Sequence, residues 1–61
     1  MRIAELLHEV QYGQRISIEF KIGIVTGTVQ TLVKVLDVKA ITAEIKCITA
    51  ENNEIKVVVE E

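Results

Sequence analysis

The chain has 61 residues and a mass of 6.8 kDa, which is enough for one small domain spanning residues 1–61. At this size the free energy gained by burying apolar surface barely exceeds the cost of ordering the chain. The sequence has one Cys, no Pro and three Gly, and it lacks the disulfides or metal ligands that support other tiny domains. We therefore expect a homo-oligomer, whose subunit contacts supply the missing stability.

Composition and charge exclude several classes of protein. A hydrophobic content of 49% with 26% charged residues argues against disorder. The net charge of -2 gives no attraction to a phosphate backbone, so nucleic acid is disfavoured as a partner. No apolar run is long enough to span a membrane, and a single thiol, Cys47, suits a reducing compartment. These features indicate a cytoplasmic protein with no membrane partner.

The N-terminal segment carries the spacing of an amphipathic helix. Apolar residues recur at i, i+3, i+4 and i+7, with charged residues between them. They are Ile3, Leu6, Leu7 and Val10. We predict a helix over residues 2–11, ended near Gly13, because glycine commonly follows the last helical turn.

Alternating apolar and polar residues come next, which is typical of a strand with one buried face. The apolar positions are Ile16, Ile18, Phe20 and Ile22. A tight reversal at residues 21–23 then leads into a second, antiparallel strand at residues 24–26.

Residues 28–36 fit two patterns. Val29, Leu32, Val33 and Leu36 have helical spacing, and Thr28 could serve as the N-cap, but alternate residues also fit a strand. We favour a helix, because a strand would place both leucines on its polar face.

The C-terminal part reads as an extended segment over residues 41–49, a turn at residues 51–54 and a strand over residues 55–60. A two-residue loop at Asn52 and Asn53 would pair Ile48 with Val57 but also Glu51 with Glu54. A three-residue loop would instead face Thr49 and Cys47 with Val57 and Val59. The sequence leaves this register open.

The elements together predict an α+β fold in the order αββαββ. We expect one antiparallel sheet with the helices packed on one face.

Four stretches resemble a family of small, functionally unassigned proteins encoded by phages and prophages of Gram-positive bacteria. The resemblance implies a small phage accessory protein and assigns no site residues. The stretches are residues 3–7 (IAELL), 13–18 (GQRISI), 27–29 (GTV) and 44–53 (EIKCITAENN).

A second resemblance is to Sm-like RNA-binding barrels, which assemble as rings of identical subunits. It rests on a helix followed by residues 16–20 (ISIEF), a glycine and residues 25–29 (VTGTV). The Asp and Asn that those proteins use around the base pocket have no counterpart after Val29.

No catalytic residues, metal ligands or cofactor motif can be assigned. His8 has no second histidine or nucleophile beside it, and its place on the polar helix face indicates a surface residue. Cys47 lacks a cationic neighbour on its own face of the predicted strand, which favours a buried packing role. We therefore expect a protein that is not an enzyme.

The junction between the second strand and the middle helix could bind an anion. The N–H groups of Thr28, Val29 and Gln30 would point out of the helix start. Arg15 and Lys21 could add positive charge, and Tyr12 could stack on a base. The predicted ligand-binding residues are Tyr12, Arg15, Lys21, Thr26, Gly27 and Thr28.

These observations favour a homo-oligomeric sponge that sequesters an anionic cyclic nucleotide and so blunts a host defence. The alternative is inhibition of a host or phage protein by direct contact, through a strand edge or the face that carries Val58. RNA binding by an Sm-like ring is a third, more distant reading.

Overall fold

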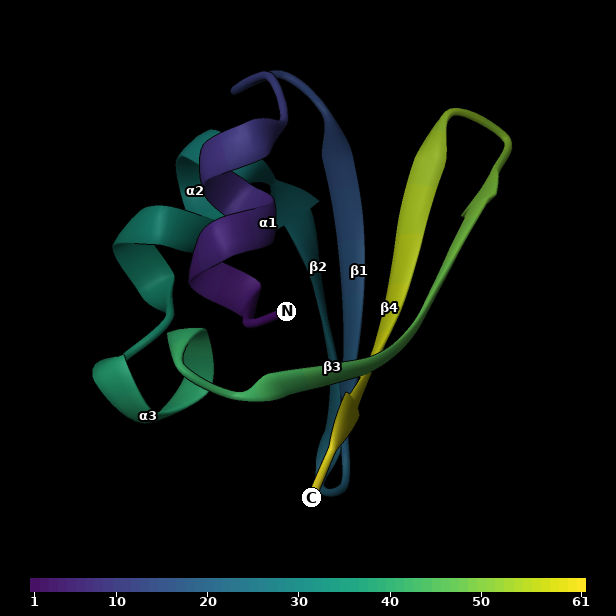
Figure 1. Ribbon diagram of the computed structural model, residues 1–61. Helices are drawn as coiled ribbons and strands as arrows, with labels where there is room; N and C mark the ends of the chain where they lie inside the picture. Colours follow the sequence, from purple (N-terminus) through teal and green to yellow (C-terminus); the bar gives the residue numbers. More distant parts are fainter.

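A computed structural model describes residues 1–61 as two layers, three helices against a four-stranded sheet (Figure 1). All three helices lie on the same side of the sheet. The elements are α1 (Ile3–Glu9), β1 (Arg15–Phe20), β2 (Gly23–Thr28), α2 (Val29–Val35), α3 (Val38–Ile41), β3 (Glu44–Glu51) and β4 (Glu54–Glu60).

The α+β class is confirmed, but the predicted element order and the antiparallel sheet are wrong. The order is αββααββ, and the strands lie in the order β2-β1-β4-β3. β1 pairs with β4 in parallel, whereas both outer pairs are antiparallel. The physical reason is burial: the two strands that carry fully buried side chains take the two central positions, and they happen to run in the same direction.

The core fills the space between the sheet and the helices. β1 contributes Ile16 and Ile18, and β4 contributes Val57 and Val59. The helices contribute the other buried side chains, Ile3, Leu6, Leu7, Val29 and Leu32. Since Ile18 and Val57 are partners in the parallel ladder, the alternation read from the sequence places both on the helix-facing side.

The middle segment is a helix, as predicted. Thr28 is its N-cap, and the Thr28 Oγ1 accepts a hydrogen bond from the Thr31 N–H at 3.3 Å. The helix buries Val29 and Leu32.

The segment after this helix differs from the prediction. Asp37 caps a further short helix, α3, by accepting a hydrogen bond from the Ala40 N–H at 2.8 Å. The extended chain therefore begins at Glu44 rather than at residue 41. A side-chain cap of this kind is a local signal that hydrophobic periodicity does not contain.

The β3–β4 hairpin has the two-residue loop. Asn52 and Asn53 both have positive φ, 52° and 62°, as a tight hairpin of this type requires. Ile48 therefore faces Val57, and Glu51 faces Glu54. Lys46 lies at an irregularity of the ladder between Ile45 and Cys47, which shifts the pairing by one residue.

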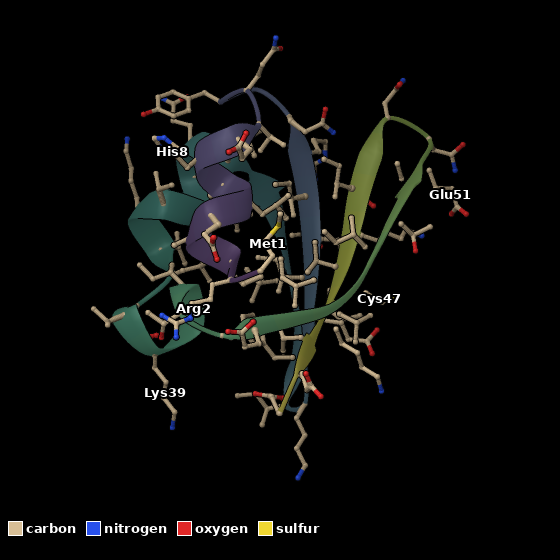
Figure 2. All side chains as sticks on the ribbon, viewed as in Figure 1. Met1, Arg2, His8, Lys39, Cys47 and Glu51 are labelled. Atoms are coloured by element: carbon tan, nitrogen blue, oxygen red, sulfur yellow. The ribbon has the colours of Figure 1, made fainter.

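Three side-chain placements complete the comparison with the sequence. His8 is exposed, as predicted. Cys47 is also exposed, on β3 (Figure 2), so its predicted burial is wrong: the ladder irregularity turns it to the face that no helix covers. The alternation predicts Ile22 on the buried face of the first strand, but Ile22 lies in the β1–β2 turn with 98% of its surface exposed. None of the helices has both the length and the apolar character needed to cross a membrane.

Candidate binding surface

The residues predicted to bind an anion do not gather in one place. Arg15 begins β1, and Lys21 follows its other end. Six residues of extended chain separate them by about 20 Å. One small anion therefore cannot contact both side chains in a single subunit.

Two of the three predicted anion donors at the start of α2, the N–H groups of Val29 and Gln30, are already used. The Val29 N–H donates to the Gln14 carbonyl at 3.1 Å, and the Gln30 N–H donates to the Tyr12 carbonyl at 3.2 Å. The Thr31 N–H is taken by the Thr28 hydroxyl. The expectation of free N–H groups is wrong for Val29 and Gln30, because their N–H groups tie the loop between α1 and β1 to the helix.

Three of the other predicted residues also have neighbours within the fold, whereas the Tyr12 side chain is largely exposed. The Thr26 hydroxyl donates to the Ser17 hydroxyl at 3.3 Å. A Cβ added to Gly27 would lie 3.7 Å from side-chain atoms of Thr31 and Leu32, so α2 fills the space beside this glycine. Arg15 lies 4.0 Å from a carboxylate oxygen of Glu54.

An apolar groove lies elsewhere, between the turn end of the β1–β2 hairpin and the α2–α3 connection. We call it the hairpin groove; its volume is about 790 Å³. Eight of its twelve lining residues are hydrophobic. The lining residues are Phe20, Ile22, Gly23, Ile24, Val25, Val35, Leu36, Asp37, Lys39, Ala40, Ala43 and Glu61.

Local structure explains why the hairpin groove stays open. α2 covers the far end of β2, where it packs beside Gly27, and ends at Val35. The chain then runs through Leu36 and Asp37 into α3. The turn end of the hairpin is left without a helix over it, so apolar side chains that would otherwise be core form an accessible floor.

Apolar side chains on both walls of the groove are largely exposed. Ile22 and Ile24 on the strand side are 98% and 63% exposed, and Val35 on the helix side is 65% exposed. Isolated exposed aliphatics are ordinary, but a contiguous group around one depression marks an interaction surface.

Charged groups of both signs lie around the groove. Asp37 is held as the α3 cap, and a carboxylate oxygen of Glu61 accepts a hydrogen bond from the Lys21 N–H. Lys39 extends away from α3 (Figure 2). The combination of an apolar floor with a mixed-charge border suits a protein segment better than a polyanion.

Periodicity had placed Phe20 and Leu36 in the core, and both are partly buried against it. The sequence does carry a signal for the groove: the apolar residues Ile24 and Val35 fit neither predicted core face.

The His, Cys, Asp and Glu side chains form no group that could hold a metal ion. A comparison of the chain with protein-family models, with curated proteins and with solved structures found no match.

Proposed function

We propose that this protein is a non-enzymatic binding protein that acts by direct contact with another protein, holding an apolar segment of that partner in the hairpin groove. The observation that carries the proposal is the exposed apolar lining shared by Ile22, Ile24 and Val35 around one depression. These side chains are removed from water only when a partner covers them, and that removal is energetically favourable.

The lining of the groove also favours a partner of a particular chemistry. Its floor offers dispersion and hydrophobic contacts but few fixed polar groups. We expect the bound segment to contribute two or three large apolar side chains, with charged residues outside the contact. Inhibition of a host or phage protein would be one use of such contact.

Nucleotide sequestration has less support from the geometry. The residues expected to hold the anion lie at opposite ends of β1, and the amides at the start of α2 donate within the chain. No specific contact favours a nucleotide over an apolar segment.

Selection from a random peptide library on the immobilised protein tests the proposal. We expect enrichment of peptides with several large apolar residues. Val35→Glu and Ala40→Glu place a carboxylate in the groove, and each should abolish capture because an unpaired charge is costly to bury. Circular dichroism would verify that both variants are folded.

Thr49→Glu is the matched control, since Thr49 is exposed on β3 and does not line the groove. Peptide capture should be unchanged in this variant. The proposal fails if no apolar peptides are enriched, or if Val35→Glu and Thr49→Glu affect capture equally.

A further inference from the structure

Apart from the hairpin groove, the fold leaves the edge of the sheet along β2 unpaired. β2 is an outer strand that pairs only with β1. The two-residue turn makes Phe20 and Gly23 a hydrogen-bonded pair, so the backbone groups of Gly23, Val25 and Gly27 point toward β1. The N–H and C=O groups of Ile24 and Thr26 and the N–H group of Thr28 consequently point outward along the sheet, whereas the Thr28 C=O, at the N-cap position, accepts the first hydrogen bond of α2.

This edge lacks the features that protect strand edges. No residue of Gly23–Thr28 is charged, and none is proline. Proteins usually block an exposed edge with lysine, proline, a bulge or a covering segment, because an open edge pairs with other chains.

The opposite edge of the same sheet carries several of these protections. β3 contains charged residues at Glu44, Lys46 and Glu51 and an irregularity beside Lys46. The chain around Met1 also covers its beginning: the Ile45 N–H donates to the Met1 carbonyl at 2.8 Å, and Arg2 bridges to Glu44. β2 is therefore the less protected of the two edges of the sheet.

The β2 sequence is able to pair with itself. In an antiparallel arrangement with Thr26 on a two-fold axis, Thr26 faces Thr26 of a second copy, and Ile24 faces Thr28 in both directions. The outward backbone groups then meet one another, giving about four hydrogen bonds between subunits: two between the Thr26 residues, and one from each Thr28 N–H to the Ile24 carbonyl of the other copy. No like charges face each other along this strand, and a closed two-fold contact ends after two chains.

The exposed surface of the single chain also favours a partner. Its accessible area is 4365 Å², whereas the scaling law gives roughly 3,950 Å² for a compact monomer of this mass. The surplus, roughly 400 Å², is about half of the area that each partner loses in an interface of standard size. Only nine of the 61 residues are buried.

We propose that the protein forms a two-fold dimer in which the β2 strands of two copies pair antiparallel about Thr26, joining two four-stranded sheets into one of eight strands. The proposal is independent of what the hairpin groove binds. It would place the two grooves on the same helix-covered face of the joined sheet, so that the dimer is bivalent for the groove's partner.

Disulfide trapping tests the register. In a hydrogen-bonded antiparallel pair the two Cα atoms lie about 5.5 Å apart, within disulfide range. Thr26→Cys in a Cys47→Ser background should form a covalent dimer on mild oxidation. Ile24→Cys in the same background should not, because the two copies of residue 24 would be separated by about 14 Å along the strands.

A second variant tests the dimer without oxidation. Thr26→Lys would put two ammonium groups opposite each other and should weaken dimerisation roughly tenfold or more in sedimentation experiments. Thr26 is exposed, so the fold of the subunit should persist. Thr49→Lys, on the other edge strand, should leave the dimer unchanged.

Three results would overturn the proposal: a wild-type protein that sediments as a monomer, a covalent dimer through residue 24 but not residue 26, or equal loss of dimer in Thr26→Lys and Thr49→Lys. Failure of the groove to capture peptides would leave these results unaffected. Conversely, loss of the dimer would not prevent a single subunit from capturing a peptide.

Discussion

Glu51 and Glu54 face each other as the last pair of the β3–β4 ladder, next to the two-asparagine turn. Two like charges at this position are unfavourable. Each carboxylate has its own cation: Lys56 Nζ lies 3.1 Å from Glu51 Oε1, and Arg15 Nε lies 4.0 Å from Glu54 Oε2. The positive φ angles of the turn and these two ion pairs together select a register that charge repulsion alone would oppose.

Removing the lysine should therefore be more harmful than removing its partner. We expect Lys56→Gln to lower the free energy of unfolding by about 0.5–1 kcal/mol, since it leaves Glu51 facing Glu54 without compensation. Glu51→Gln removes both the attraction and the repulsion and should be nearly neutral. Urea unfolding measures both, and added salt should reduce the effect of Lys56→Gln. Equal losses in the two variants would contradict this account of the register.

Proline substitutions in α2 should separate its first turn from its interior. Lys34→Pro breaks the helix near its end and should cost about 3 kcal/mol or more, enough to unfold so small a domain. Gln30→Pro affects a first-turn position that tolerates proline in most helices. Here it also removes the N–H that donates to the Tyr12 carbonyl, so we expect a loss of about 1 kcal/mol.

Thermal unfolding followed by circular dichroism measures both proline variants. Gln30→Ala, which keeps the N–H, is the control and should be close to wild type. If Gln30→Pro were as stable as Gln30→Ala, the bond to Tyr12 would not contribute to stability.

Acid should weaken the tie between β3 and the start of the chain. The Arg2 side chain, with Nε 3.3 Å from Glu44 Oε1, and the terminal amino group, 3.4 Å from Oε2, both hold the pKa of Glu44 below its ordinary value. A carboxyl group with a lowered folded-state pKa stabilises the fold above its unfolded pKa, and this contribution is lost as the pH falls through the folded-state value.

The wild type should therefore be slightly more stable than Glu44→Gln at neutral pH, and the difference should vanish in the acid range below the ordinary glutamate pKa. Because both side chains are about half exposed, the difference should be small. Thermal midpoints of the two proteins across the acid range measure it. A difference that grew on acidification would contradict the lowered pKa.

Nucleotide retention distinguishes the two binding hypotheses. With no Trp and one Tyr, the chain absorbs weakly in the ultraviolet, so a bound adenine nucleotide would dominate the spectrum. After incubation with cyclic nucleotides and cyclic ADP-ribose isomers, we expect gel filtration to return the protein without excess nucleotide absorbance. Retention of one nucleotide, lost in Arg15→Ala, would instead support sequestration and count against the groove as the functional surface.

Most local elements of this protein follow from its sequence, although the short helix α3 does not. The helical spacing of Ile3, Leu6 and Leu7 and the alternation of Ile16 and Ile18 each identify one buried face, and those faces form the core. The Asn52–Asn53 pair identifies its hairpin, because asparagine tolerates the left-handed backbone that the turn needs. These signals lie within a few residues of chain and depend on backbone sterics and burial.

The neighbours of each strand were decided only by the tertiary structure. Nothing near Ile18 in the sequence indicates that Val57, far along the chain, is its parallel partner. That pairing arises because all the apolar faces of the chain must share one small core. In the packed chain the side chains of Ile24 and Val35 stay exposed. The N–H groups of Val29 and Gln30 are used in hydrogen bonds within the chain. The sequence alone therefore predicted every element except α3, whereas the packed chain determined which surfaces remain free to bind, because exposure depends on what every other segment covers.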